Sequence, residues 1–279
     1  MAKPQTRAPA GADRRRSAFP IIDLEQFGRL AKSRKGRDVE RMLSSPISED
    51  WVTWTAFRLL QRCAAKTWWP DLVALARKEN PRLALPSGWK QFPELLPWQS
   101  VASPRGYEAA SRDRLRRSEV GAWQERSHGL RPVEGESEID VTLRNRVLLV
   151  FAEAKLGSDI SAGTTYDPER NQILRNIDCV IDRAEGRVPM FWMLVRDDCR
   201  ERSYSQLMRH YRAHPDELAE KLPHHDRGAV AALAGNLALL RWQDVVARVV
   251  AASPDDDAEI ASIKHELVSR CVPSSGDSP

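Results

Sequence analysis

The chain has 279 residues, of which 29% are charged and 42% hydrophobic, and its 43 basic residues slightly outnumber its 39 acidic ones. This length allows one large α/β domain with a sizeable core, or a core with a helical annex. No apolar run approaches the length of a membrane span and no secretory signal precedes the first expected helix, so we expect a cytoplasmic protein that does not contact membranes. Arginine far outnumbers lysine, which permits bidentate phosphate contacts without requiring them.

Several common kinds of site are excluded by the spacing of their residues. The four cysteines are far apart and form no Cys-x-x-Cys pair, so we expect free thiols rather than a zinc cluster. His210 and His214 stand four residues apart, but Pro215 ends their helix and no Glu-x-x-His pattern accompanies them. The absence of a glycine-rich phosphate loop and of a Gly-x-Ser-x-Gly elbow argues against nucleotide hydrolases and serine hydrolases.

The N-terminal part begins with an arm and then becomes helical. Residues 1–18 are rich in Pro, Ala, Gly and Arg without an apolar period, which predicts a disordered arm with a solvated arginine run. Two short helices are expected at residues 23–31 and 37–43. A stronger helix begins after Ser48, which is a good N-cap, and Glu49 in its first turn is well placed beside the helix dipole.

Residues 64–130 combine tryptophans with several prolines, which predicts short elements and a helical insertion or subdomain. Arginines gather near its end, interleaved with Tyr107 and Trp123; they include Arg114, Arg116 and Arg117. Arginines that contact phosphates and aromatics that stack on bases are the composition of a nucleic-acid groove. Acidic residues lie among these arginines, so an amphipathic helix with salt-bridged surface arginines is the alternative.

Residues 138–155 are the stretch around which the chain is organised. Apolar and β-branched residues run on both sides of a polar turn, which predicts a β-hairpin. Asp140 interrupts the first strand. Glu153 and Lys155 share one face near the end of the second strand, whose apolar character predicts burial on both faces. Buried charges are costly unless they pair with each other or hold a metal, so these three residues require a structural or functional reason.

The register of this hairpin decides whether the charged residues meet. Strand side chains alternate between faces, so an even-numbered residue of the first strand must pair with an odd-numbered residue of the second. A two-residue turn at Asn145-Arg146 satisfies this condition. It places Asp140 opposite Phe151, with Glu153 as a diagonal neighbour within reach of a shared ion.

The C-terminal half alternates helices and strands. A helix is expected from Pro168 to about residue 185, followed by a strand at 188–195 that a right-handed crossover makes parallel to the strand of Glu153. The other expected elements are four helices and one strand, namely helices 204–213, 227–234, 242–252 and 255–271 and strand 237–241. The pattern predicts a single α/β domain over residues 19–272, with a mixed central sheet flanked by helices, and a disordered tail at 273–279.

An aspartate on one strand followed by Glu-x-Lys on the next resembles the motif of the PD-(D/E)XK superfamily of restriction-endonuclease-like nucleases. The matching residues are Asp140 and Glu153-Ala154-Lys155. The order of elements is also similar, because a Gly157-Ser158 turn and then a helix carrying Gln172 follow the hairpin. The resemblance covers roughly residues 138–198, and it implies a restriction-endonuclease-like fold.

The resemblance also implies a chemistry. A Mg²⁺ or Mn²⁺ ion held by Asp140 and Glu153 would polarise a phosphodiester and lower the pKa of a bound water, while Lys155 stabilises charge or assists that water. Gln172 matches an accessory position that orients a water or the phosphate. Glu49 matches an acidic residue that an earlier helix often supplies, although the helix dipole also accounts for it. We therefore expect a nuclease acting on DNA, in which a homodimer would let one site serve each strand.

Five arginines are candidates for contacts with the nucleic acid. Three belong to the stretch at residues 64–130, and two lie at the start of the helix that carries Gln172; the five are Arg114, Arg116, Arg117, Arg170 and Arg175. Arginine suits this role because its guanidinium group binds phosphate bidentately.

Three other interpretations stay open. Glu153 and Lys155 can form a plain ion pair, with Asp140 solvated near a sheet edge. The chain can also be a catalytically inactive nucleic-acid-binding protein built on the same fold. A protein-interaction subunit that uses the tryptophan-rich stretch is the third.

Overall fold

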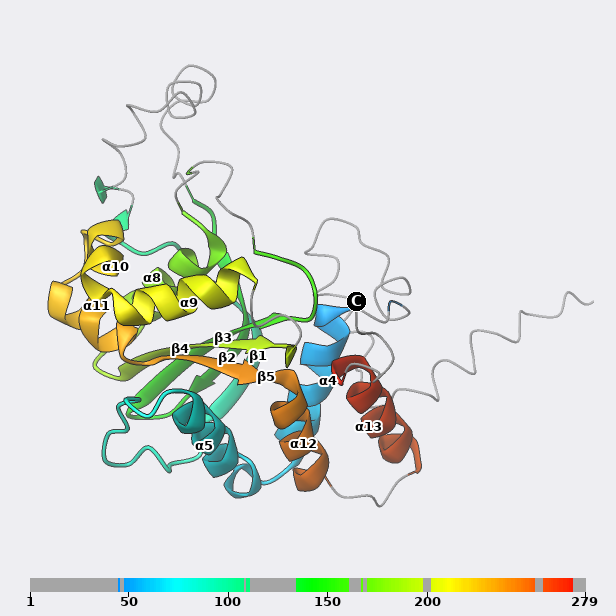
Figure 1. Cartoon of the computed structure of the whole chain (residues 1–279). Helices are drawn as coiled ribbons and strands as arrows, with labels where there is room; N and C mark the ends of the chain where they lie inside the picture. Colours follow the sequence, from blue (N-terminus) through cyan, green and yellow to red (C-terminus); the bar gives the residue numbers. More distant parts are fainter. Residues whose placement is uncertain are drawn as a thin grey trace, which may run out of the picture.

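A computed structural model describes residues 45, 48–107, 109–110, 134–160, 167, 170–197, 202–253 and 258–272. These residues form a five-stranded sheet with β1 to β5 in spatial order: β1 (Glu94–Val101), β2 (Ser137–Arg144), β3 (Leu148–Lys155), β4 (Val188–Val195) and β5 (Leu237–Arg241) (Figure 1). The first three strands pair antiparallel, and β3, β4 and β5 pair parallel. The expectation of an α/β protein with a mixed central sheet is confirmed.

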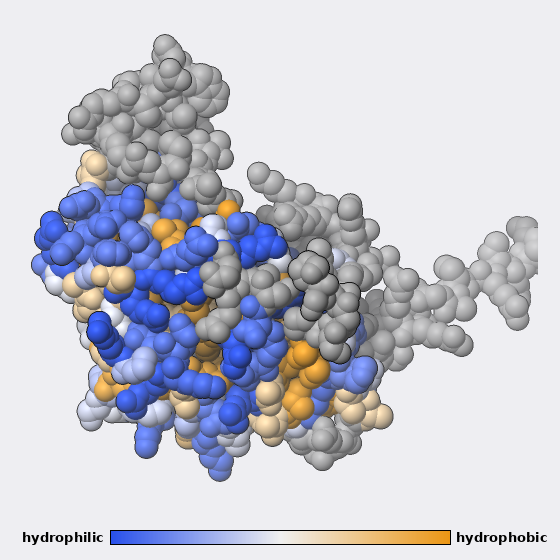
Figure 2. Space-filling model, in the orientation of Figure 1, coloured by the Kyte–Doolittle hydropathy of each residue, from blue (hydrophilic) through white to orange (hydrophobic). Residues whose placement is uncertain are grey.

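Helices cover both faces of this sheet, as Figure 1 shows. One face carries α4 (Glu49–Arg62), α5 (Trp69–Glu79) and α12 (Trp242–Ala252), with α13 (Ala258–Cys271) packed against α4 and α12. The other face carries α8 (Gln172–Asp182), α9 (Ser203–Ala213), α10 (Pro215–Lys221) and α11 (Arg227–Ala234). The helices of each layer bury an apolar stripe against the sheet. Hydrophilic residues dominate the outer surface over α9 to α11 (Figure 2). No helix in the described ranges has both the length and the apolar character that crossing a membrane requires.

The parallel half of the sheet closely follows the sequence prediction. All eight residues of β3 are buried, as expected of a strand with helices on both faces. β4 has the predicted bounds and pairs with β3 in parallel, with Glu153 opposite Met193. α11, β5 and α12 also span the predicted residues, whereas the short helix α10 was not expected.

The stretch at residues 64–130 is not a helical insertion where the structure describes it. It contributes α5 and the edge strand β1, together with a short 3-10 helix at Ala65–Thr67. Pro97 argued against a strand, yet an edge strand tolerates proline because one of its sides has no ladder to support. Trp98 adopts a positive φ of 46° and stacks on Trp54, with ring centroids 4.8 Å apart, so packing holds the backbone in this unfavourable region.

The tryptophans in the described part of this stretch mostly belong to the core. Trp68 and Trp69 are buried, and Trp69 stacks on Trp192 of β4 with ring centroids 6.1 Å apart. Trp98 is buried as well. These residues therefore hold α5 and β1 on the sheet and are not a surface for another protein. Trp123 lies outside the described residues.

The register of the β2–β3 hairpin differs by two residues from the predicted one. Thr142, not Asp140, lies opposite Phe151. The cause is Asn145, whose side-chain oxygen accepts the backbone N–H groups of Val147 and Leu148 at 2.9 and 2.8 Å and so moves the turn one residue later. An even shift keeps the paired residues 141–144 on their predicted faces, with Thr142 on the face of Phe151.

Several expected segments lie outside the described residues. They are the arm at residues 1–18, the short helices at 23–31 and 37–43, and the tail at 273–279.

Candidate active site

Glu153 and Lys155 lie at the carboxyl end of β3, and both are buried, with 1% and 7% of their surface exposed. Their Nζ and Oε1 atoms are 2.8 Å apart. Two residues of spacing on a strand place both side chains on the face that α8 covers. The predicted same-face arrangement of this pair is thus present.

Three side chains donate hydrogen bonds to the Glu153 carboxylate. Oε1 accepts from Lys155 at 2.8 Å and from Gln172 at 2.6 Å, and Oε2 accepts from Asn176 at 2.9 Å. Burial raises the pKa of Glu153, and the positive charge of Lys155 opposes this shift. The carboxylate is therefore fixed in one orientation by charge and by amide donors together.

The Lys155 ammonium group lies among carboxylates from three elements. Glu153 is the nearest, Glu49 Oε2 is 3.5 Å away, and Asp140 is close enough to act on the same charge. Burial alone would lower the pKa of Lys155, but the attraction of Glu153 and then of Glu49 outweighs it and holds the pKa above its ordinary value. Lys155 is consequently a permanent positive charge at the end of β3.

Asp140 sits where β2 and β3 separate. The ladder between these strands ends at the pair of Val141 and Ala152. Beyond that point the Asp140 carboxylate takes the place of a backbone partner, because its Oδ2 accepts the N–H of Ala154 at 2.9 Å. Ala154 stands between Glu153 and Lys155 in sequence, so this bond ties Asp140 to the Glu-x-Lys segment.

Glu49 reaches the same region from the first turn of α4. Its Oε1 accepts hydrogen bonds from the N–H of Leu156 at 3.0 Å and the hydroxyl of Ser158 at 2.6 Å. Ser48 caps the helix by accepting from the N–H of Trp51 at 3.2 Å, which fixes the orientation of that first turn. Glu49 therefore anchors the turn that follows β3, a role that neither of the two sequence interpretations included.

Asn176 is a site residue that the sequence reasoning missed. It lies four residues after Gln172 on α8, and this spacing puts both amides on one face of the helix, toward Glu153. The spacing alone could have revealed it once Gln172 was singled out. Asn171 fixes the start of α8 by accepting the N–H of Leu174 at 2.9 Å.

The donor atoms around Glu153 suit a hard cation. Carboxylate oxygens of Asp140 and Glu153 are ligands that Mg²⁺ and Mn²⁺ prefer, and one or two of them are enough when waters complete the coordination. Glu49, Asp140 and Glu153 do not bring their oxygens within 4.8 Å of one another as a set; in the described ranges only Asp178, His224 and His225 form such a group. A third ligand role for Glu49 therefore has no geometric support.

The two arginines proposed at the start of α8 bind the protein itself. Arg170 is 1% exposed, with Nη2 2.8 Å from Glu134 and Nη1 2.7 Å from Asp178. Its guanidinium carbon lies 3.7 Å from the ring centroid of Tyr107. The expectation that Arg170 contacts nucleic acid was wrong, because no surface of the side chain is left for a ligand.

Arg175 is partly exposed but also engaged. Its Nε lies 2.8 Å from Glu134, and Nη2 donates to the carbonyl oxygens of Gly135 and Glu136 at 3.1 and 2.6 Å. A contact with nucleic acid would have to replace these bonds. The other three proposed arginines, Arg114, Arg116 and Arg117, lie outside the described residues.

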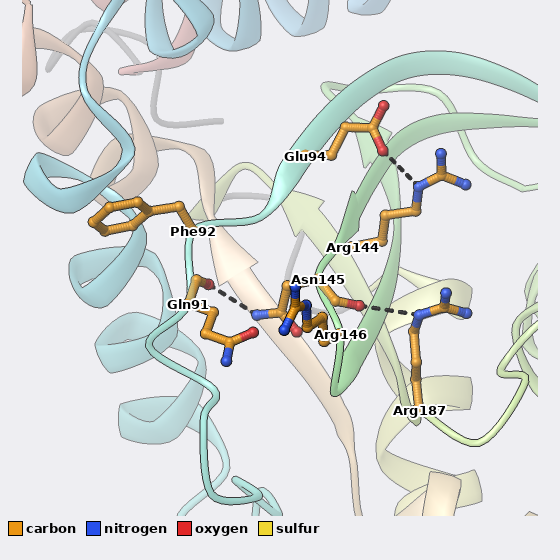
Figure 3. A pocket seen from close by; sticks show the side chains of 7 residues that line it. All are labelled: Gln91, Phe92, Glu94, Arg144, Asn145, Arg146 and Arg187. Atoms are coloured by element: carbon orange, nitrogen blue, oxygen red, sulfur yellow. Dashed lines mark hydrogen bonds and ion pairs between the residues drawn. The ribbon is translucent and has the colours of Figure 1, made fainter.

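A surface pocket of about 360 Å³ lies at the other end of the sheet. It is lined by residues before β1, by the β2–β3 turn and by Arg187, and Figure 3 shows Phe92 turned away from the guanidinium groups of Arg144 and Arg187. The length of β3 separates it from Lys155 by roughly 20 Å. The pocket is therefore distinct from the charged cluster.

No protein-family model, curated protein or solved structure matches this chain. What the site can do follows from its own residues: a buried carboxylate held by two amides, a second carboxylate fixed to the backbone, and an ammonium group paired with the buried carboxylate. Such a set can hold a hard cation and stabilise negative charge that develops on a phosphate.

Proposed function

We propose that this chain is a metal-dependent nuclease that hydrolyses phosphodiester bonds of DNA, on a site that resembles the PD-(D/E)XK pattern. The observation that carries the proposal is the bond from Ala154 to Asp140, which holds an aspartate against a buried Glu-x-Lys pair. The order of strands supports it too, since the aspartate comes from β2 and the pair from β3. A plain ion pair would not require Asp140 as a third charged group.

Each residue has a distinct task in this proposal. Asp140 and Glu153 would hold Mg²⁺ or Mn²⁺, which when bound polarises the phosphate and activates a water. Lys155 neutralises charge that builds up on the phosphate, and its fixed position costs no reorganisation during the reaction. Gln172 and Asn176 keep the Glu153 carboxylate oriented, as outer hydrogen-bond donors do for metal ligands.

Purified full-length protein is expected to nick supercoiled plasmid in Mg²⁺ or Mn²⁺ and to be inactive in chelator. Linear DNA and RNA in the same assay would report the substrate. Glu153→Gln keeps the size of the side chain but removes the ligand charge and one of the two acceptor oxygens, so it should be inactive. A wild-type protein that cuts no substrate in the presence of either metal ion would refute the proposal that the chain is a nuclease.

One observation favours a catalytically inactive nucleic-acid-binding protein as the second candidate. Both oxygens of Glu153 already have donors, so the described residues satisfy this carboxylate without an ion. In that case the protein would bind DNA with a salt dependence that reflects phosphate contacts, but the metal would change neither the binding nor the substrate.

Asn176→Leu is expected to reduce the rate of cleavage about 10- to 100-fold and to raise the Mg²⁺ concentration needed for half-maximal rate, because Glu153 loses the donor at Oε2. Initial rates measured over a Mg²⁺ series check this expectation. Asn80→Leu is the matched control, since Asn80 is a buried asparagine that binds the carbonyls of Gly235 and Leu237 away from the site. An equal change in Mg²⁺ requirement in both variants would show a general loss of stability instead.

A further inference from the structure

Two consecutive histidines converge on one buried carboxylate oxygen on the side of the sheet that α8 covers. The Nε2 atoms of His224 and His225 lie 2.8 and 2.6 Å from Oδ1 of Asp178. The three atoms all lie within 4.8 Å of one another. The histidines belong to the loop between α10 and α11, while Asp178 belongs to α8, so the tertiary fold brings the group together.

The group is separate from the Glu153 site although both use α8. Gln172 and Asn176 face Glu153, whereas Asp178 lies two residues further on and points to a different side of the helix. Its ligand types also differ. Two imidazole nitrogens and one carboxylate oxygen suit Zn²⁺ and related transition metals, while oxygen ligands alone suit Mg²⁺.

The surroundings hold both the carboxylate and one histidine in place. Arg170 Nη1 binds the other oxygen of Asp178 at 2.7 Å, which leaves Oδ1 directed at the imidazoles. The Tyr107 ring packs against His224 at a 63° angle, and a Cβ atom at Gly106 would come within 2.7 Å of the His224 Cβ. Within the described residues Nδ1 of His224 has no hydrogen-bond partner, so packing sets the orientation of this ring. An orientation fixed before binding is what a metal site needs.

We propose that Asp178, His224 and His225 bind one Zn²⁺ ion or a similar transition-metal ion. Bonds of about 2.0 to 2.2 Å in tetrahedral geometry place ligand atoms about 3.3 Å apart, so each separation between an imidazole Nε2 and Oδ1 of Asp178, now 2.8 and 2.6 Å, increases by roughly half an ångström or slightly more when the ion binds. The His224 and His225 side chains are 5% and 11% exposed and that of Asp178 is fully buried, so the three ligands are largely shielded from solvent; a water would be the fourth ligand.

The test measures metal binding and does not use nuclease activity, so its failure and the failure of the proposed nuclease are distinguishable. Full-length protein stripped with chelator and dialysed against Zn²⁺ should retain one equivalent by elemental analysis. Its melting temperature should rise with added Zn²⁺. Co²⁺ in place of Zn²⁺ should give a visible absorption band stronger than that of hydrated Co²⁺, because a four-coordinate site lacks the inversion centre of the hydrated ion.

His225→Gln separates metal binding from hydrogen bonding. The glutamine amide can still donate to Asp178 but is a poor zinc ligand, so the variant should fold while its zinc affinity falls at least about 100-fold. His224→Gln is the second variant. His210→Gln is the matched control, because His210 is an exposed histidine whose Nε2 lies 2.8 Å from Glu217. Retention of one Zn²⁺ only when both His224 and His225 are present supports the site. A wild type that retains no Zn²⁺, or equal retention by His225→Gln, overturns it.

Discussion

Lys155→Ala is expected to abolish metal-dependent cleavage, by at least about 10²- to 10³-fold, while DNA binding stays nearly unchanged. The ammonium group lies between Glu153 and Glu49, at 2.8 and 3.5 Å, and it would act on the reacting phosphate. Binding depends on phosphate contacts spread over a wide surface, so the loss of one buried lysine should change it little. Cleavage and filter binding of the same preparation measure the two effects.

The same substitution also tests the alternative that Glu153 and Lys155 form only a structural ion pair. Removing one partner of a buried pair leaves the other uncompensated, which typically costs about 3–5 kcal/mol. Gln172 and Asn176 still bind Glu153, so we expect a value near the lower end, about 3 kcal/mol. Lys155→Met keeps most of the buried stem and is the variant of choice if the alanine protein unfolds.

The control is another buried lysine. Lys264 is 4% exposed and donates to the carbonyl of Ser253. Lys264→Ala should lower the melting temperature but leave the cleavage rate per folded molecule intact. A Lys155→Met protein that is folded and cuts DNA at the wild-type rate would contradict the proposed role of the lysine, and with it the assignment of the site.

The strands that position the site were predictable because they are buried on both faces. β3 and β4 are nearly continuous apolar runs, and a strand, helix and strand of this length favour a parallel pair, as found. The alternation of strand side chains then fixed the common face of Glu153 and Lys155. The alternation of side chains and the apolar composition of a buried strand are both properties of a short stretch of chain. A single sequence therefore shows both.

The predictions that were wrong or incomplete have different physical causes. β1 was missed because Pro97 is acceptable only at a sheet edge, and edge position is a property of the whole sheet. The hairpin register was wrong because Asn145 closes the turn with its own side chain. Asn176 was missed although its spacing from Gln172 places both side chains on one face of α8.

The prediction for Arg170 failed because the burial of a charged side chain is hard to predict from sequence. An arginine in a polar segment suggests a surface contact, yet here its partners are Glu134, 36 residues earlier, and Asp178, 8 residues later. Together with Tyr107 they enclose the guanidinium group. Burial of a charged residue depends on such partners being assembled by the fold, which a single sequence does not display.

Arg170→Ala is therefore expected to destabilise the protein by about 3–5 kcal/mol, because it removes the guanidinium group that bridges the buried carboxylates of Glu134 and Asp178. For a domain of this size each kcal/mol lowers the melting temperature by about 2–4 °C, so the shift should be on the order of 10 °C. Denaturant unfolding in the presence of chelator measures the loss in free energy of unfolding without any contribution from bound metal.

Arg241→Ala is the matched control for this experiment. Arg241 also pairs with a carboxylate, at 2.6 Å from Asp244, but both side chains are about one-third exposed. Water screens such a pair, so its loss should cost at most about 1 kcal/mol. If Arg170→Ala instead melts like the wild type and binds DNA more weakly, Arg170 acts in binding and does not stabilise the fold. A large loss of stability with DNA binding per folded molecule unchanged identifies Arg170 as the residue that joins Glu134 to α8.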